Sequence, residues 1–406
     1  MVQPSDVHRS KDTKLTRRRI LRTLTAAGVT PVAASRITVD DVKAADDDQV
    51  PISLDVKGEI KKNVPADWYD KLIHTRDVRS KLSRNHDHRE SVLGVGYSPG
   101  KRGGENPYII VELNEDSDSK EQDRSEIPDE REGVTIEKEE VKAASPDNCP
   151  DTPYYESLCD SYDCTTLPEG DDIPAGPMVE FPGIGRWGSH TSQVLWSDDT
   201  LKLGWMTSAH YITDCGVGHE AYHQPANDGG DGYKIGEITA IHPEYDISII
   251  ETTEFDDPNI DPSPYVHESS NLSSGYTYGP IETVMTKDGV DLWGREDREV
   301  FRYGAGTCYG NGRVEGTIQD WEVLGEPEDW CNSSIKEVVR IRIDNSGDGD
   351  SGALHWGYYE PDDAYLGIGS HSASRQSTSI FSDRDRVAFC SAGYRIYNDL
   401  GYFWSQ

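Results

Sequence analysis

Three short segments carry a serine, a histidine and an aspartate in surroundings that suit nucleophilic catalysis. Residues 349–352 read Gly-Asp-Ser-Gly, so Ser351 stands between glycines in a segment typical of a tight turn. Glycines allow backbone N–H groups to converge where a side chain would block them. A serine nucleophile needs such a turn, because its hydroxyl must lie beside donors that stabilise a developing oxyanion.

The other two segments place His210 and Asp246 beside apolar runs. Residues 205–210 read Trp-Met-Thr-Ser-Ala-His, which predicts a buried strand that ends at a general base open to a cleft. Residues 246–250 read Asp-Ile-Ser-Ile-Ile. A buried carboxylate at the start of such a run can orient an imidazole and stabilise its protonated form. The order along the chain is therefore His, Asp, Ser.

These segments resemble those of the chymotrypsin-like (trypsin-fold) serine proteases, whose His-Asp-Ser order is distinctive among triad enzymes. Thr-Ser-Ala-His is similar to that family's Thr-Ala-Ala-His, the Asp246 segment is similar to its Asp-Ile-Ala-Leu, and Gly-Asp-Ser-Gly is identical. The resemblance covers roughly residues 175–406. It is greatest to the compact secreted bacterial members of the streptogrisin type, which end in a helix, as residues 387–404 are expected to do.

The resemblance implies a role for each residue that matches the family's motifs. His210 would be the general base, Asp246 the acid that orients it, and Ser351 the nucleophile. The backbone N–H groups of Gly349 and Ser351 would form the oxyanion hole. Ala353 replaces the last glycine of the family's usual Gly-Asp-Ser-Gly-Gly, and this change removes no catalytic group.

The resemblance also suggests where a substrate would bind. Ser370, His371 and Ser372 are similar to the family's edge strand that pairs with the substrate backbone, and they are expected to line the substrate site. A histidine that serves only as polar cover on an exposed edge is the alternative. Asn345 stands six residues before the nucleophile, where the family's preference for Lys or Arg would need an aspartate, so it argues against that preference. The neighbouring acids Asp344 and Asp348 keep such a preference open.

A competing motif is His219-Glu220-x-x-His223, which matches the zincin signature. Two histidines four residues apart bind one zinc ion only if the segment is helical, with the glutamate as base. Glycines precede the motif, and Pro225 with an Asn-Asp-Gly-Gly sequence follows it. We therefore expect a solvent loop here and no metal site, with a zinc peptidase as the less favoured interpretation.

Acidic residues dominate the composition and are spread over the whole chain. The 406 residues include 74 Asp and Glu against 40 Lys and Arg, which gives a formal net charge of −34. Nucleic-acid binding needs a basic face and is not expected. Diffuse acidity of this kind favours adaptation to a high-salt environment, where counterions screen self-repulsion and a charged surface preserves solubility.

The first residues are basic, unlike the rest of the chain. Residues 16–22 read Thr-Arg-Arg-Arg-Ile-Leu-Arg, and a mildly apolar stretch follows. This pattern looks like a twin-arginine export signal, so a secreted or cell-surface location is expected; a basic disordered tail is the alternative. The apolar stretch is too short for a membrane span. Seven cysteines fit an exported chain, and Cys308 with Cys331 is the pair we expect to form a disulfide.

Hydrophobic periodicity divides the chain into an N-terminal and a C-terminal folded region. Helical spacing of apolar residues predicts a helix over residues 67–82, and apolar runs predict strands over 92–97 and 107–113. Beyond residue 178, short apolar runs recur between turn residues, which is typical of an all-β protein. The resemblance implies that this C-terminal region forms a pair of antiparallel six-stranded β-barrels. The predicted segments are a signal peptide (1–36), an acidic arm (37–66), a small α/β domain (67–142), a Cys/Pro/acid-rich linker (143–176) and a trypsin-like protease domain (177–406).

Together these patterns predict an exported serine endopeptidase that needs no cofactor and acts on protein or peptide substrates. A trypsin-fold binding protein with a silent site is the alternative from another class, and an esterase would use the same triad. The small α/β domain is expected either to be a simple folded spacer or to be a pro-region. A pro-region would assist folding or inhibit the enzyme within the same molecule.

The acidic composition predicts that salt stabilises the folded chain. We expect the midpoint of urea unfolding to rise steeply between dilute buffer and molar KCl, because screening reduces repulsion in the compact state. Circular dichroism measured over a series of KCl concentrations tests this. Equal midpoints in dilute buffer and in molar salt would refute adaptation to high salt.

Overall fold

The fold is known from a computed structural model that describes residues 49–86, 89–102, 104–146, 172–173, 176, 178–184, 186–197, 201–212, 214–223, 233–252, 261–262, 265–267, 277–322, 334–346, 349–376 and 386–404. The predicted signal peptide and nearly all of the predicted linker lie outside these residues. Within them, no helix combines the length and the apolar character that a membrane span requires.

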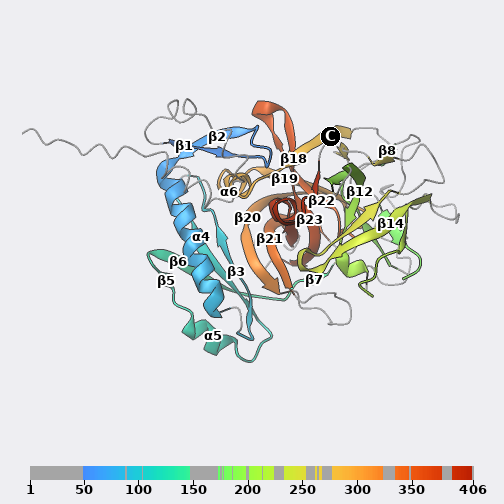
Figure 1. Cartoon of the computed structure of the whole chain (residues 1–406). Helices are drawn as coiled ribbons and strands as arrows, with labels where there is room; N and C mark the ends of the chain where they lie inside the picture. Colours follow the sequence, from blue (N-terminus) through green and yellow to red (C-terminus); the bar gives the residue numbers. More distant parts are fainter. Residues whose placement is uncertain are drawn as a thin grey trace, which may run out of the picture.

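The N-terminal unit combines a long helix with a small sheet. Its strands are β1 (Gln49–Ser53), β2 (Lys61–Pro65), β3 (Val92–Ser98), β4 (Tyr108–Asn114), β5 (Glu130–Arg131) and β6 (Val134–Val141), and its helices are α4 (Ala66–His86) and α5 (Lys120–Glu126). β3 pairs antiparallel with β4, and β4 pairs parallel with β6 after the crossover through α5. Buried residues of α4, including Val78 and Leu82, pack against Val95 and Val111 of the sheet. Figure 1 shows α4 lying across this sheet.

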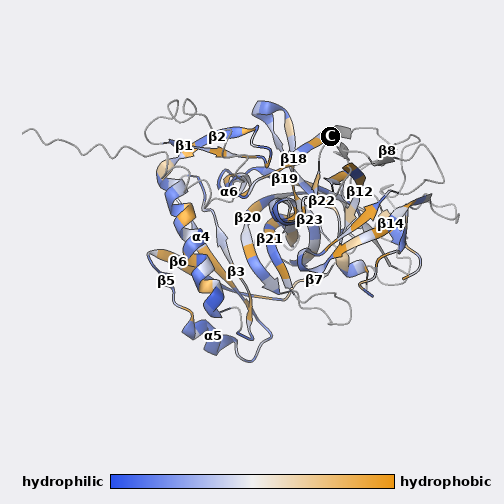
Figure 2. Ribbon diagram, in the orientation of Figure 1, coloured by the Kyte–Doolittle hydropathy of each residue, from blue (hydrophilic) through white to orange (hydrophobic). Residues whose placement is uncertain are grey.

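Hydropathy separates the two helices of this unit. Figure 2 shows mixed polar and apolar residues along α4, whereas α5 is almost wholly polar. α4 buries Trp68, Tyr69 and Leu72 together with polar residues such as Arg76 and Arg79. This helix is therefore covered along most of its length, while α5 buries only Asp123 among its own residues.

The first β-sheet of the C-terminal region holds the strands that carry His210 and Asp246. It has eight strands in the order β10-β9-β13-β14-β15-β12-β11-β25. The bounds are β9 (Met178–Phe181), β10 (Arg186–Ser189), β11 (Val194–Ser197), β12 (Leu201–Thr207), β13 (Glu220–His223), β14 (Tyr233–His242), β15 (Ile247–Glu251) and β25 (Phe403–Trp404). All of its pairings are antiparallel. β8 (Asp172–Ile173) and β16 (Asp261–Pro262) form a separate parallel pair.

The second sheet closes into a six-stranded antiparallel barrel. The ring runs β19-β20-β21-β24-β23-β22 and returns to β19. Its strands are β19 (Glu299–Gly304), β20 (Cys308–Glu322), β21 (Ser334–Ile343), β22 (Leu354–Tyr359), β23 (Ala364–Gln376) and β24 (Arg386–Ala392). β17 (Tyr265–His267) and β18 (Thr277–Val284) extend it, and α6 (Lys287–Arg295) and α7 (Gly393–Leu400) pack beside it.

These pairings confirm the predicted fold class, an all-β trypsin-like fold preceded by a small α/β unit, and the second sheet is a six-stranded antiparallel barrel as predicted. The first sheet differs from the predicted six-stranded barrel, because it has eight strands and, among the described residues, no pairing closes it into a ring. Closure of the second barrel leaves no free edge around the ring, which is how barrels avoid exposed strand edges. Trp404 links the two sheets, because β25 pairs with β11 while the indole of Trp404 lies so close to β23 that a Cβ at Gly367 would be 2.7 Å from it.

The N-terminal unit is joined to the second barrel through a continuous sheet. β3 pairs with β20, with Tyr97 opposite Thr317 and Val95 opposite Gln319. Gly96 is required at this seam, because a Cβ there would lie 2.5 Å from the Thr317 carbonyl oxygen. The sheet therefore crosses the predicted boundary between the small domain and the protease domain without a break.

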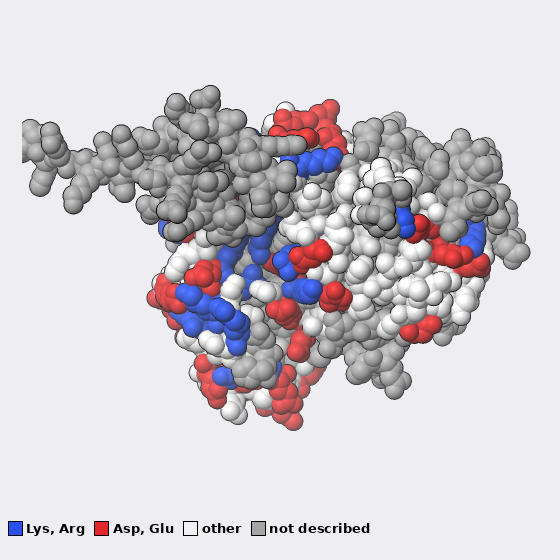
Figure 3. All heavy atoms as spheres, in the orientation of Figure 1, with Lys and Arg blue, Asp and Glu red and all other residues white. Residues whose placement is uncertain are grey.

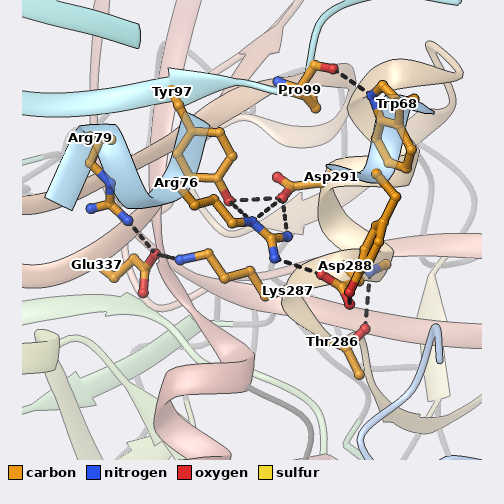
Figure 4. A network of polar contacts seen from close by, with 12 residues as sticks. Trp68, Arg76, Arg79, Tyr97, Pro99, Thr286, Lys287, Asp288, Asp291 and Glu337 are labelled. Atoms are coloured by element: carbon orange, nitrogen blue, oxygen red, sulfur yellow. Dashed lines mark hydrogen bonds and ion pairs between the residues drawn. The ribbon is translucent and has the colours of Figure 1, made fainter. Parts of the chain in front are cut away.

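A buried network of charged residues also connects α4 to α6 (Figure 4). Arg76 donates from Nη1 to Asp288 Oδ1 at 2.7 Å and also pairs with Asp291. The hydroxyl of Tyr69 donates to Asp288 at 2.9 Å, and that of Tyr97 donates to Asp291 at 2.8 Å. The two carboxylates and the guanidinium are buried. The N-terminal unit thus supplies the cation that balances two acids of the barrel side.

A second cluster of charges lies beside the first. Lys287 pairs with Glu337 of β21, and Arg79 of α4 lies 3.8 Å from the same carboxylate. Burial lowers the pKa of Lys287 to about 8. Burial alone raises the pKa of Glu337, but the charges of Lys287 and Arg79 outweigh it and lower the value to about 2. The carboxylate is therefore held ionised by cations from both regions of the chain.

Removing one member of this network should destabilise the whole molecule. We expect Arg76→Met to lower the free energy of unfolding by about 3–5 kcal/mol, because two carboxylates stay buried without their guanidinium. Lys81→Met is the matched control, since Lys81 lies on the same helix in exposed pairs with Asp77 and Glu132 and should contribute less than about 1 kcal/mol. Urea unfolding of both variants measures the difference, and equal losses would contradict a structural role for the network.

Candidate active site

His210 and Asp246 come together because they flank paired strands. His210 lies in the 3₁₀ turn η2 (Ala209–Tyr211) that follows β12, and Asp246 lies between η3 (Pro243–Tyr245) and β15. β12 and β15 are antiparallel, with Thr207 opposite Ser248, so the end of one strand lies beside the start of the other. Asp246 has a φ of 49°, a left-handed conformation that aspartate tolerates better than most residues.

The histidine and the aspartate form a buried hydrogen-bonded pair. His210 Nδ1 lies 2.9 Å from Asp246 Oδ2 and 3.0 Å from Oδ1, and the backbone N–H of His210 donates to Oδ1 at 3.0 Å. Both residues are at most 2% exposed. Because a carboxylate only accepts hydrogen bonds, Nδ1 carries the proton, and in the neutral imidazole Nε2 has the lone pair of a base.

Ser351 lies in the loop between β21 and β22, and contacts from the first sheet hold it. Its carbonyl accepts hydrogen bonds from the Ser189 backbone N–H at 2.9 Å and from the Tyr211 hydroxyl at 3.1 Å. Tyr211 is the residue after His210, and the two rings have centroids 4.7 Å apart. The serine loop is therefore fixed directly against the segment that carries the histidine.

A buried ion pair fixes the other side of the serine loop. Asp350 pairs with Arg302 of β19 at 2.5 Å, and both side chains are fully buried. Thr307 donates to the same carboxylate from its backbone N–H at 2.9 Å and from its hydroxyl at 2.6 Å. Ser189 Oγ donates to the Gly349 carbonyl at 2.7 Å. These contacts leave the turn around Ser351 little freedom.

The Ser351 hydroxyl donates to the Ser372 carbonyl at 3.2 Å. In this structure its proton points at β23, so a rotation about the Cβ–Oγ bond is needed to direct it at an imidazole. Rotation of a hydroxyl group costs little free energy, and catalytic hydrogen bonds often shorten only when substrate binds. Ser208, two residues before His210, donates to the His371 carbonyl at 2.9 Å, and Gly352 N–H donates to the same carbonyl at 2.8 Å. The serine segment and the histidine segment therefore meet at β23.

The turn also presents two backbone donors. Among the residues that the structure describes, the N–H groups of Gly349 and Ser351 donate no hydrogen bond. Gly349 and Gly352 have φ values of 89° and 87°, in the region that favours glycine. A Cβ at Gly352 would lie 2.1 Å from the Ser189 carbonyl oxygen, so only glycine fits there. The glycines thus give the turn a shape in which both N–H groups are available to an anion.

Two buried histidines lie behind the serine loop. His371 Nδ1 lies 3.0 Å from His355 Nε2, and His371 Nε2 lies 3.4 Å from Ser346 Oγ. Burial, with the nearby charges of His371 and Arg302, moves the pKa of His355 well below its ordinary value. Asn345 turns away from this pair, since its amide donates to the Thr307 carbonyl at 2.7 Å.

The residues predicted to line the substrate site, Ser370, His371 and Ser372, all lie on β23, but each makes different contacts. Ser370 is paired on both sides, opposite Leu354 and Ser391, and is buried. His371 contacts His355, and the Ser372 carbonyl accepts from the Ser351 hydroxyl. His371 is fully buried and is not polar cover on an exposed edge.

The zincin motif does not form a helix. Glu220 and His223 lie in β13, where four residues span about 13 Å, so the two histidines cannot share one ion as they would on a helix. His219 instead contacts Asp214 at 2.9 Å, and Glu220 pairs with Lys234 at 2.7 Å. In the described part of the chain, no cluster of metal-binding side chains is present. The predicted partner of Cys308, Cys331, lies outside the described residues, whereas Cys390 is a buried free thiol.

Sequence reasoning missed the groups that hold the serine loop in place. Ser189, Tyr211 and Arg302 each contact the turn, yet none belongs to a motif, and each lies far from Ser351 along the chain. The only available signal was that Tyr211 follows the histidine directly.

Comparisons with known proteins found similar chains among solved structures. No protein-family model and no curated protein matches the chain. Among solved structures, protease A of Thermobifida fusca is 15% identical, with 57% of this chain and 97% of that chain covered and a TM-score of 0.37. The chymotrypsin of Cellulomonas bogoriensis is 16% identical, with 57% and 97% covered and a TM-score of 0.36. A protease of M. tuberculosis in its active form is 14% identical, with 58% and 89% covered and a TM-score of 0.27.

Structural similarity at these TM-scores does not support a statement about the function of this chain. The fold rests on the strand pairing given above, and the function is inferred from the geometry around Ser351.

The buried histidines near the first sheet predict how stability depends on pH. Burial lowers the pKa of His223 to about 4 and that of His190 to about 3. In the unfolded chain both take up a proton near pH 6.5, so each favours unfolding by about 1.4 kcal/mol per pH unit as the pH falls below that value. This loss of stability ends at about pH 4 for His223 and about pH 3 for His190.

We expect His223→Gln to flatten this dependence between about pH 6.5 and 4. Glutamine can still donate to the Met178 carbonyl, which His223 contacts at 3.0 Å, but it does not titrate. Urea unfolding at pH 7, 6 and 5 measures the slope, and His74→Gln on the exposed face of α4 is the control. A slope identical to that of the unmodified chain would contradict a neutral buried His223.

Proposed function

We propose that this protein is a serine endopeptidase that hydrolyses peptide bonds through His210, Asp246 and Ser351. The observation that carries the proposal is the buried His210–Asp246 hydrogen bond on a segment whose next residue, Tyr211, contacts Ser351 directly. An imidazole that a buried carboxylate orients beside a serine turn is the arrangement that a general base and a nucleophile require.

In the proposed reaction, Ser351 Oγ attacks the scissile carbonyl while His210 Nε2 removes its proton. Asp246 stabilises the imidazolium that forms and keeps the ring in the correct tautomer. The imidazolium then protonates the leaving amine, which gives an acyl-enzyme on Ser351. A water molecule, deprotonated by the same imidazole, attacks the ester and releases the acid.

The N–H groups of Gly349 and Ser351 are proposed to stabilise the tetrahedral intermediates. Both belong to the glycine-rich turn that Asp350 and its partners hold rigid, so they need no reorganisation when charge develops. A donor of this kind typically contributes about 3 kcal/mol to the barrier. No step needs a metal ion or an organic cofactor.

A silent binding protein on the same fold is the second candidate. The direction of the Ser351 hydroxyl, toward Ser372, is the observation that favours it. An organofluorophosphonate separates the two candidates, because it labels only a serine that its surroundings activate.

The location of the enzyme is a proposal from sequence alone. We propose that the protein is exported through the twin-arginine signal in residues 1–36. We also propose that it is active in a high-salt environment outside the cell. In Figure 3, acidic and basic side chains lie together over the left part of the face and near its right rim, with a broad uncharged area between them. The turn η6 (Glu360–Asp362) adds two acids to the β22–β23 hairpin.

Substitution of the nucleophile and of the orienting acid tests the reaction. We expect Ser351→Ala to lose detectable casein hydrolysis and fluorophosphonate labelling, and Asp246→Asn to lower kcat by about four orders of magnitude through the wrong histidine tautomer. Ser248→Ala, on the same strand as Asp246 but outside the triad, is the matched control.

Circular dichroism of each variant shows whether the fold is kept. Peptidase activity retained in a folded Ser351→Ala variant would overturn the assignment, as would a folded, unmodified chain that neither reacts with the probe nor cleaves casein.

A further inference from the structure

Arg302 of β19 contacts several parts of the serine loop at once. The residue is fully buried, and its guanidinium pairs at 2.5 Å with Asp350, the residue directly before the nucleophile. Its Nη2 group donates to the Asn345 carbonyl and to the Thr307 hydroxyl, each at 2.8 Å. The Nε–H group, in contrast, has no hydrogen-bond acceptor among the residues that the structure describes. Arg302 therefore has one buried donor that its contacts with the loop do not use.

The residue opposite Arg302 carries a buried nitrogen that is also unpaired. β19 and β22 are antiparallel, and Arg302 stands opposite His355 in their register. Directly opposite residues of antiparallel strands project from the same face, with Cβ atoms about 4.5–5.5 Å apart. His355 is fully buried, and within the described part of the chain its Nδ1 has no hydrogen-bond partner. A donor and a potential acceptor, each costly to leave unpaired, therefore lie on facing side chains.

The other nitrogen of His355 begins a series of contacts that leads back to the serine turn. His355 Nε2 lies 3.0 Å from His371 Nδ1, and His371 Nε2 lies 3.4 Å from Ser346 Oγ. The backbone N–H of His371 donates to the Ala353 carbonyl at 2.8 Å, and its carbonyl accepts from the Gly352 N–H at 2.8 Å. The histidine pair thus holds the residues after the nucleophile, whereas the guanidinium holds the residue before it.

The tautomer of one ring determines the tautomer of the other. Only one of the two facing nitrogens, His355 Nε2 and His371 Nδ1, can carry the hydrogen when both rings are neutral. If His355 Nδ1 accepts a hydrogen bond, its Nε2 is the donor, and the hydrogen of His371 lies on Nε2, toward Ser346. If His355 Nδ1 instead carries the hydrogen, two donors face each other at Arg302 and neither has an acceptor. The first arrangement pairs more of the buried groups.

We propose that Arg302 is a positioning residue that sets the tautomers of both histidines, with its Nε–H donating to His355 Nδ1 directly or through one water molecule. The inference rests on the proposed peptidase function, because the groups held in this way are the Ser351 turn and its backbone donors. Arg302 acts on this turn by two routes, through Asp350 before the nucleophile and through the histidine pair after it.

The two routes require an arginine at this position. The planar guanidinium presents donors in fixed directions, so one group can pair with Asp350 while Nε–H points elsewhere. A lysine ammonium is a single point charge on a flexible stem. Arg302→Lys should therefore keep a cation for Asp350 and lose the contact with His355, which separates the second route from the first.

The tautomers of His355 and His371 test the proposal in the full chain. Long-range ¹H–¹⁵N NMR spectra of protein labelled with ¹⁵N-histidine distinguish protonated from unprotonated ring nitrogens, and His355→Gln and His371→Gln assign the signals. We expect the hydrogen on Nε2 in both rings of the unmodified chain, and mixed or reversed tautomers in Arg302→Lys. Arg313→Lys on the neighbouring strand, in a partly exposed pair with Glu299, is the matched control and should leave both tautomers unchanged.

The rate at which a fluorophosphonate labels Ser351 measures the effect on the turn. We expect Arg302→Lys to react about tenfold to a hundredfold more slowly than the unmodified chain, because small displacements of reacting groups reduce rates on this scale. His355→Gln, whose amide can still donate to His371, should react nearly as fast as the unmodified chain. His355→Leu, which has no donor, should be slowed like Arg302→Lys. Circular dichroism shows whether each variant is folded.

Hydrogen on Nδ1 of His355 in the unmodified chain would overturn the proposal, as would tautomers that Arg302→Lys leaves unchanged. If Arg302→Lys does not fold, equal labelling rates in His355→Gln and His355→Leu would overturn it. An unmodified chain that neither reacts with the probe nor cleaves casein would overturn the peptidase, and with it the role of Arg302 in the reaction. The NMR spectra would still show whether Arg302 orients the two rings, so the two failures are distinguishable.

Discussion

The pairing of β20 with three other strands is the constraint on which the rest of the structure depends. One edge of β20 pairs with β21 along most of its length, while the other edge pairs first with β19 and then with β3. The same strand therefore closes the second barrel and extends it into the N-terminal unit. β19 carries Arg302, which fixes Asp350 next to the nucleophile, and β3 carries Tyr97 into the buried charges of α6. Barrel closure, the serine turn and the position of α4 follow from one set of hydrogen bonds.

Local sequence patterns predicted helices and strands well where the hydrophobic spacing of the side chains determines the secondary structure. The helix expected over 67–82 is α4, four residues longer at its end because Ser83 and His86 are also buried. The strands expected over 92–97 and 107–113 are β3 and β4. The pairing of β3 with β20 could not be predicted, because Gly94 and Gly96 look like weak strand residues until a neighbouring backbone lies against them. A seam between segments more than 200 residues apart leaves no periodic signal in either.

In the candidate site, too, some features could be predicted from local sequence and others depend on tertiary contacts. The chain order and the apolar runs indicated that His210 and Asp246 would meet, and the pairing of β12 with β15 gives the reason. The Gly and Pro residues around the zincin motif argued correctly against a helix, but the expected solvent loop is wrong, because residues 220–223 form the strand β13 and His223 is buried. The partner of the Ser351 hydroxyl and the ion pair of Asp350 could not be predicted, since serine, arginine and aspartate at distant positions are common and acquire a role only through tertiary contact. The domain boundaries, the export signal and the roles of the three residues remain predictions.

The charges shared between α4 and α6 also bear on how this sequence can change over evolutionary time. A replacement of Arg76 leaves Asp288 and Asp291 without their cation, and a replacement of either acid leaves the guanidinium with surplus charge in a dry interior. Matching changes at positions more than 200 residues apart would be needed to keep the balance. The N-terminal unit and the barrel should therefore have diverged together, as one inherited piece, and recombination that joins this N-terminal unit to the barrel of a distant homologue should seldom give a folded protein.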